Sequence, residues 1–156
     1  MKSTSGGVLF LLGPHTRFPL GPYCKKQTRT SHSSTEAEVV ALDKVIFKEG
    51  FPALELWDLI FKGLTGKPVK MEVFEDNQAA ARVVKTGKSQ ELRHVHRVHG
   101  VSIKALSEAF KRKQFKLTDC HTMARAADIF TKGFTSKAMW NHVSELIGMV
   151  DKEVAD

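Results

Sequence analysis

The sequence predicts a mixed domain of the α/β or α+β class. Apolar and polar residues alternate over short segments, apolar residues recur at helical spacing over longer ones, and the two kinds of segment are interspersed. The 156 residues suffice for one domain with its own core. A content of 42% hydrophobic and 26% charged residues excludes a wholly disordered chain, and two cysteines exclude a disulfide framework.

Four segments are predicted to be extended. The apolar run 6–12 reads as a buried strand that ends at Gly13-Pro14. Three prolines fall within 14–22, so residues 15–30 are predicted to form a short, irregular strand followed by a polar loop. Apolar and polar residues alternate over 69–73 and again over 115–117, which indicates two further strands.

The first half of the chain is predicted to contain two consecutive helices. Ser33 and Glu36 have the spacing of a capping box, and the helix that they begin should run to about Lys48 and stop at Gly50. Pro52 is suited to the first turn of a second helix. The predicted inward stripe of that second helix is Ala53, Trp57, Ile60, Phe61 and Leu64.

The second half is predicted to be mainly helical. Asp76-Asn77 should cap a short helix that closes at Gly87, and a longer helix is expected over about 92–112. Helical spacing returns from about Ala124, and Trp140 is placed with the core rather than on a base-stacking surface. The final apolar stripe consists of Met139, Val143, Leu146, Ile147 and Val150.

Basic residues are concentrated at the start of the chain. The net charge is +7, and residues 1–35 contain five Lys and Arg residues but no Asp or Glu. Lys25, Lys26 and Arg29 cluster in a polar stretch and could contact the phosphate backbone of a nucleic acid; a solvated basic surface is equally compatible with the charge.

The two cysteines and the length of the apolar runs indicate the cellular compartment that the protein would occupy. Cys24 and Cys120 do not make a metal-binding pair and suit a reducing compartment, so we expect an intracellular protein, cytoplasmic or nuclear. The run Val8–Leu12 is too short to cross a bilayer, and no membrane partner is expected.

Three acids stand at the boundaries of the predicted elements. Glu38 should point inward between Leu42 and Val45, whereas Glu36 should point the other way; Asp76 follows a strand, and Asp128 begins a late helix. Carboxylates so placed could converge on Mg²⁺. Spacing alone favours the alternative that these acids cap or polarise helix N-termini.

Five short motifs occur in an order that changes this balance. They are Lys2-Ser3-Thr4-Ser5-Gly6, Lys25-Lys26-Gln27-Thr28, Ser33-Ser34-Thr35-Glu36-Ala37-Glu38, Glu75-Asp76-Asn77-Gln78-Ala79-Ala80 and Ala127-Asp128-Ile129-Phe130-Thr131-Lys132. In this order the chain resembles the ribonuclease H domain of copia-type retrotransposon polyproteins, from Lys2 to about Phe134.

The resemblance implies a ribonuclease H-like mixed sheet and hydrolysis of the RNA strand of an RNA–DNA hybrid, with the reverse transcriptase portion of the same polyprotein as a neighbour. It implies two Mg²⁺ or Mn²⁺ ions, held by Glu38, Asp76 and Asp128 as the catalytic and metal-binding acids. Residues 1–135 would form this domain, and 136–156 a C-terminal helix and tail. The residues assigned to nucleic-acid binding are Lys25, Lys26, Arg29, Asn77, Gln78 and Arg93.

One departure from the family limits this expectation. The family carries a further metal-binding Asp on a first, central strand just upstream of the motif that begins here at Lys2, and this chain has no equivalent. We therefore expect weakened or absent metal binding and little or no ribonuclease H activity from these 156 residues. The strands at 6–12 and 69–74 should be left with unpaired inner edges. The alternative is a non-catalytic remnant that binds nucleic acid through its basic lobe.

Three histidines lie close together at positions 94, 96 and 99. Their spacing on one helix would place them on different faces, so joint binding of zinc is not expected. We predict instead a basic, polar helix face that includes Arg93 and Arg97.

Overall fold

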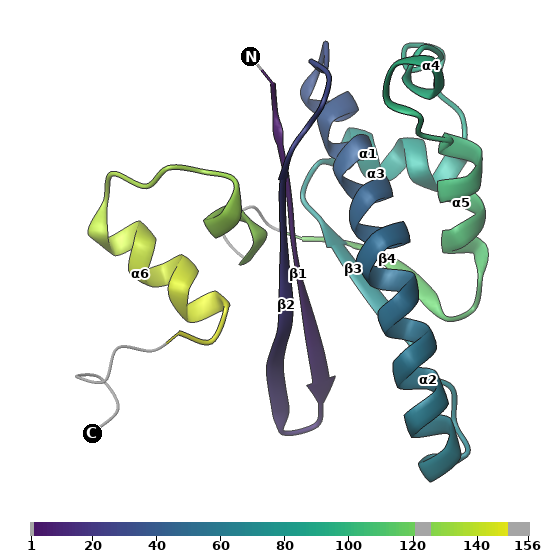
Figure 1. Cartoon of the computed structure of the whole chain (residues 1–156), viewed down its shortest axis with the longest axis vertical. Coiled ribbons are helices and arrows are strands. Elements are labelled where there is room, and N and C mark those ends of the chain that lie inside the picture. The colour runs from purple at the N-terminus through teal and green to yellow at the C-terminus, as the bar shows by residue number, and fades with distance from the viewer. Residues whose placement is uncertain (1, 121–125, 150–156) are drawn as a thin grey trace.

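The computed structural model describes residues 2–120 and 126–149, and these form an α+β fold with two small sheets (Figure 1). The fold class predicted from the sequence is therefore confirmed. A β-hairpin stands between a C-terminal segment and a layer of helices that covers the second sheet. The elements are β1 Thr4–Gly13, β2 Thr16–Lys26, α1 Ser34–Val45, the π-helical η1 Ile46–Gly50, α2 Phe51–Thr65, β3 Met71–Glu75, α3 Gln78–Thr86, α4 Val95–His99, α5 Ile103–Lys111, β4 Phe115–Asp119, the 3₁₀ segment η3 Ala126–Phe130 and α6 Lys137–Leu146.

The hairpin is longer and more regular than the sequence predicted. Residues 15–30 were expected to contain only a short, irregular strand, but β2 continues from Thr16 to Lys26 in antiparallel pairing with β1. Among the described strands β2 has β1 as its one partner, so the missing N–H groups of Pro19 and Pro22 do not interrupt a second ladder. A bulge opposite Leu9 and Phe10 takes up the remaining irregularity.

The second sheet is a parallel pair, with β3 aligned on β4 from Met71 beside Phe115 to Glu75 beside Asp119. Within the described chain, β1 pairs with β2 alone and β3 with β4 alone. The hairpin and the parallel pair are thus separate sheets in the part of the chain that the structure describes.

A single long helix replaces the two that were predicted between residues 34 and 65. Ser33 caps it as expected, because its Oγ accepts a hydrogen bond from the backbone N–H of Glu36 at 3.1 Å. The predicted stop at Gly50 is wrong, since Gly50 has helical dihedral angles and the chain passes through η1 directly into α2. The wider π turn immediately precedes Pro52, which lacks the N–H that a regular turn would use.

The long helix predicted over about 92–112 is divided in two. Gly100 adopts φ 68° and ends α4, and Ser102 then caps α5 by accepting from the backbone N–H of Ala105 at 3.2 Å. The predicted cap and end of α3 are both correct, with Asn77 at its start and Gly87 at φ 69° after its last residue.

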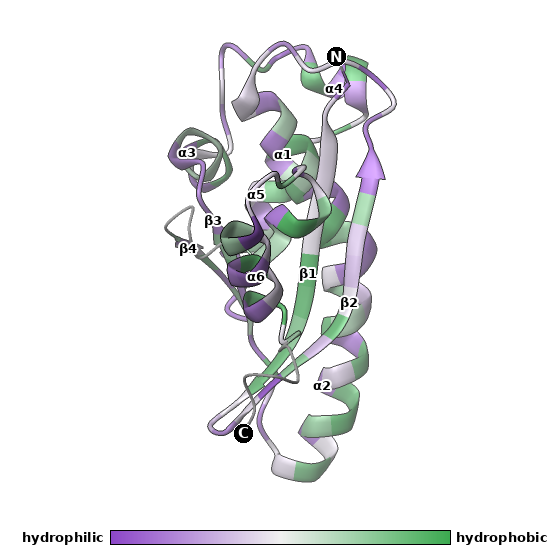
Figure 2. Ribbon diagram, turned by 90° about the vertical axis from the view of Figure 1, so that its left-hand side faces the viewer, coloured by the Kyte–Doolittle hydropathy of each residue, from purple (hydrophilic) through white to green (hydrophobic). Residues whose placement is uncertain are grey.

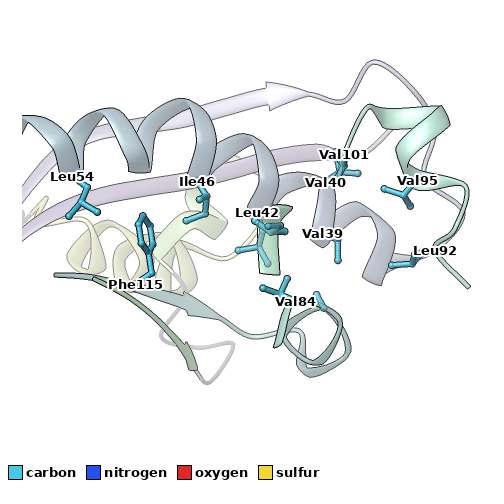
Figure 3. Close-up of a cluster of buried hydrophobic side chains, with 12 residues drawn as sticks. Val39, Val40, Leu42, Ile46, Leu54, Val84, Leu92, Val95, Val101 and Phe115 are labelled. Carbon is cyan, nitrogen blue, oxygen red and sulfur yellow. The ribbon is translucent and has the colours of Figure 1, made fainter. Parts of the chain in front are cut away.

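The hydrophobic core lies under the long helix, between it, the β3–β4 pair and the segment 84–101 (Figure 3). The predicted inward stripe of α2 is wrong in part: α2 buries Leu54, whereas Ile60 and Leu64 are exposed. The fully or nearly buried members of the cluster are Val39, Val40, Leu42, Ile46, Leu54, Ala80, Val84, Leu92, Val95, Val101, Leu106 and Phe115.

The C-terminal segment packs on the other face of the hairpin. η3 lies against β1, and α6 packs on η3 (Figure 1). Val143 is buried as predicted, but Trp140 is not part of the core, because 49% of it is exposed; its ring meets the ring of Phe134 edge to face. The predicted helical residues Ala124 and Val150 lie outside the described residues.

Across residues 2–120 and 126–149, none of the helices combines the length and the apolar character that crossing a lipid bilayer requires.

Candidate functional site

Gln27 fastens the basic stretch to the rest of the fold. Its side chain is buried, and its Nε2 donates to Ser5 Oγ of β1 at 3.0 Å and to the Ala37 carbonyl of α1 at 2.9 Å. Ser31 Oγ donates in turn to Gln27 Oε1 at 2.9 Å. One amide therefore joins β1, the loop after β2 and the first turns of α1. The predicted nucleic-acid residues on either side of it, Lys25, Lys26 and Arg29, are all exposed.

Glu36, rather than Glu38, is the fully buried acid of α1. The sequence placed Glu36 on the outer side of the helix, but none of its surface is exposed. Its Oε2 accepts from the backbone N–H of His32 at 2.9 Å, and its Oε1 lies 2.8 Å from His99 Nε2. His94 Nε2 lies 3.2 Å from Oε2, in ion-pair range but without hydrogen-bond alignment. Contacts from the loop before the helix and from the segment around α4 thus enclose this side chain.

These contacts set the charge of Glu36. Burial by itself would raise the pKa of its carboxyl, but the His32 N–H and the rings of His94 and His99 outweigh burial and hold that pKa below its ordinary value. The carboxylate is therefore ionised at neutral pH. The prediction that these histidines form only an exposed polar face is wrong for His99, whose side chain is 2% exposed.

Glu36 also brings two predicted nucleic-acid segments together. Arg29 lies three residues before His32, and Arg93 adjoins His94; the rings of His32 and His94 meet edge to face with centroids 5.5 Å apart. Both segments lie at the end of the molecule where the N-terminus lies (Figure 1). A cavity of about 490 Å³ adjoins this region, with Lys88, Arg93 and His96 in its lining and no Asp or Glu among the lining residues that the structure describes.

Glu38 lies on the side of α1 that faces the hairpin. Val45, two turns further along the same face, packs directly on Gly7 of β1, because a Cβ atom at Gly7 would lie 2.8 Å from a Val45 methyl carbon. Glu38 is half-buried, and it lies beyond the first turn of α1, so it is not a capping residue.

Asp76 occupies the junction between β3 and α3 and is half-buried. The residue that caps α3 is Asn77, whose Oδ1 accepts from the Ala80 N–H at 3.0 Å. The capping alternative for Asp76 is therefore wrong. Of the other two residues of this motif assigned to nucleic acid, Asn77 uses its side-chain oxygen for the cap and Gln78 is exposed.

Asp128 is buried within η3 and is 7% exposed. Its Oδ2 lies 2.6 Å from Lys132 Nζ, and its backbone carbonyl accepts from the N–H groups of Thr131 and Lys132. The backbone of η3 approaches β1 closely, since a Cβ atom at Gly6 would lie 3.2 Å from the Ala127 carbonyl oxygen. Asp128 thus comes to the face of the hairpin opposite α1.

The three predicted metal ligands come from three different elements of the fold. They lie on α1, at the β3–α3 junction and on η3, and within the described ranges no three His, Cys, Asp or Glu side chains lie in an arrangement that could hold a metal ion. The ion pair with Lys132 already engages one oxygen of Asp128.

Comparison of the chain with known protein families, with curated proteins and with solved structures found no match.

Sequence reasoning missed the roles of Gln27 and of the Glu36–His99 pair. A signal for Glu36 was present, because an acid three residues after a Ser cap commonly reaches back toward the start of its helix. No comparable signal existed for Gln27 or His99, whose partners lie 22 and 63 residues away in the sequence.

Proposed function

We propose that the chain is a ribonuclease H-like module of the copia type that binds RNA–DNA hybrids. The observation that carries this proposal is the contact between the motifs that bear the resemblance. Gln27 of the second motif hydrogen-bonds to Ser5 of the first and to Ala37 of the third. Gly6 of the first motif abuts Ala127 and Thr131 of the fifth. Motifs that lie far apart in sequence thus meet around the N-terminal half of β1.

Cleavage of the RNA strand would depend on one further carboxylate. Glu38, Asp76 and Asp128 would hold Mg²⁺ or Mn²⁺ together with an acid on a strand placed between β1 and β3, where each strand has one partner among the described residues. A segment preceding the domain in a longer polypeptide, next to a reverse transcriptase portion, is the natural source of that strand.

A non-catalytic nucleic-acid-binding module is the second candidate. It is favoured by a difference in arrangement between the arginines assigned to nucleic-acid binding and the acids assigned to metal binding. Arg29 and Arg93 are drawn to one end of the molecule through the contacts of Glu36, whereas the described acids form no three-ligand group. Binding of this kind would follow the phosphate backbone rather than the base sequence.

A cleavage assay on a hybrid with a labelled RNA strand separates the two candidates. We expect no metal-dependent cleavage by the 156-residue chain, and cleavage once an Asp-bearing strand is fused ahead of Lys2. Asp76→Asn in the extended chain should abolish that activity, whereas Glu108→Gln, which removes an exposed carboxylate from α5, should leave it unchanged.

The result that would overturn the enzymatic proposal is an extended chain that folds, binds the hybrid and leaves the RNA intact. That outcome would support the binding module. Failure to bind the hybrid in either form would overturn both candidates.

A further inference from the structure

The outer face of α2 carries a continuous apolar stripe. Leu56, Leu59, Ile60 and Leu64 are 54%, 78%, 40% and 76% exposed, respectively. Steps of three, four and eight residues from Leu56 place all four on one side of a helix. Figure 2 shows hydrophobic residues along this part of α2, and Figure 1 shows its C-terminal half extending past the ends of β3 and β4.

Leu56, Leu59 and Ile60 lie away from the face with which α2 packs on its own domain, whereas Leu64, seven residues after Trp57, borders that face. The buried residue of α2 is Leu54, and half-buried Trp57 and Phe61 lie on the same side. From Leu54 to Leu59 is five residues, or about 500° of helical rotation, so Leu59 points away from the core. Soluble proteins seldom leave such a stripe uncovered, and contiguous apolar patches of this kind mark interaction sites.

The charges beside the stripe identify the partner. Glu55 and Lys62 lie seven residues apart and therefore on the same flank, next to Leu59. Both are exposed, and neither forms an ion pair with another residue in the described part of the chain. Two antiparallel copies of α2 related by a two-fold axis would set Glu55 of each against Lys62 of the other, whereas in a parallel two-fold pair the flanks that carry these charges would lie on opposite sides of the interface.

We propose that the α2 stripe, defined as Leu56, Leu59, Ile60 and Leu64, binds the same stripe of a second copy of this chain in an antiparallel, two-fold arrangement. In this arrangement the surface is self-complementary in charge, as an isologous interface requires. A single pair of helices buries less than the ~1,200–2,000 Å² of a stable specific interface, so the dimer should be weak, with a Kd on the order of 100 μM. This inference does not depend on the proposed nuclease or nucleic-acid-binding function.

Sedimentation of the whole chain over a range of concentrations tests the proposal. The wild-type protein should shift from monomer to dimer between roughly 10 μM and 1 mM, around that Kd. Leu59→Ser, at the most exposed position of the stripe, should remain monomeric throughout. Leu12→Ser, at an exposed leucine on the hairpin, is the matched control and should dimerise as the wild type does.

Charge reversal tests the orientation. Glu55→Lys and Lys62→Glu should each raise the dimer Kd by about fivefold to tenfold, because each replaces two attractive pairs with two repulsive ones. An equimolar mixture of the two variants should dimerise at least as well as the wild type, since both lysines on the flank of the first variant then face glutamates on the flank of the second.

Circular dichroism of each variant establishes that it is folded. A wild-type protein that stays monomeric at millimolar concentration would overturn the proposal and would leave the stripe to a different partner. A dimer that survives Leu59→Ser, or a mixture of charge variants that fails to associate, would equally overturn it.

Discussion

Glu36 occupies an unusual position for a carboxylate, since it is fully buried and yet ionised. The contacts from His32, His94 and His99 compensate for the loss of water around its two oxygens. Each hydrogen bond to a charged group contributes on the order of 1.5–3 kcal/mol. Removing the charge of Glu36 would weaken all of these contacts at once. The contact with the His32 N–H also holds the loop that carries Arg29, which Gln27 anchors from its other end.

We predict that Glu36→Gln lowers the free energy of unfolding by about 1–3 kcal/mol at neutral pH. The folded-state pKa of Glu36 lies below its ordinary value of 4.5, so the unfolded chain takes up the proton first as the pH falls. The carboxylate therefore stabilises the fold fully above pH 4.5 and loses this effect as the pH drops through the folded pKa. Urea unfolding at pH values from 7 to 3 should show the difference from wild type narrowing below pH 4.5.

Glu108→Gln is the control for that experiment, because it removes an exposed carboxylate and should change stability by no more than ~0.5 kcal/mol. A difference between wild type and Glu36→Gln that stayed constant from pH 7 to pH 3 would show that the charge of Glu36 does not contribute.

At this scale the sequence predicted local features and missed distant ones. The caps at Ser33 and Asn77 and the glycine that ends α3 follow from neighbours within four residues, and all are correct. The orientation of Glu36 could not be predicted, because His99 reaches it only after the chain has folded back from α4. Whether Glu38, Asp76 and Asp128 bind metal stays a prediction.

At the scale of elements, α1 packs closely on the hairpin because Gly7 of β1 has no side chain. Gly7 is buried, and the two methyl carbons of Val45 fill the space that its Cβ atom would occupy, at 2.8 and 2.9 Å. Close contact between helix and strand at this position brings Glu38, two turns earlier on α1, to the same side of β1.

We predict that Gly7→Ala lowers the free energy of unfolding by about 1–3 kcal/mol, because the added methyl overlaps Val45. Val45→Ala should relieve this overlap, so Gly7→Ala should cost at least ~1 kcal/mol less in the Val45→Ala background. Thermal or urea unfolding of the two single variants and the double variant measures this coupling.

Gly21→Ala provides the matched control on the partner strand, since nothing lies within 4 Å of a Cβ atom at Gly21. It should change the free energy of unfolding by no more than ~0.5 kcal/mol. Additive effects of Gly7→Ala and Val45→Ala would contradict the close packing of α1 on β1.

Most elements followed from the sequence, and the errors have common physical causes. Proline and glycine were given too much weight: β2 accommodates two prolines because it is an edge strand, and Gly50 stays helical where Met71 Sδ would lie 3.2 Å from a Cβ atom. Conversely, Gly100 ends α4 inside a segment whose apolar spacing suggested one long helix. Periodicity identifies the kind of element, but tertiary packing decides whether a breaker residue ends it.

At the scale of the whole molecule, two features predicted from the sequence occupy different places. In the described part of the chain, β1 and β3 belong to separate sheets, while Arg29 and Arg93 belong to the loop after β2 and to the segment before α4, at the end of the molecule where the N-terminus lies (the basic end; Figure 1). In the proposed function, cleavage would need a further strand between these two sheets, whereas binding would use the basic end alone. Under the proposed function, binding of a nucleic acid can therefore be measured separately from cleavage.

We predict that binding to an RNA–DNA hybrid depends on the location of charge rather than on net charge. Replacing Lys25, Lys26 and Arg29 with Gln lowers the net charge from +7 to +4, and the same reduction follows from replacing three exposed lysines in and beyond α5. Those control positions are Lys104, Lys111 and Lys113. Each lost phosphate contact lowers the slope of log K against log salt by about 0.9, so the first variant should lose two to three units of slope and the control almost none. Fluorescence anisotropy over a salt series measures the slope for each variant. Equal slopes for the two variants would contradict the prediction, since they would show that the hybrid responds to net charge and not to the position of the charges.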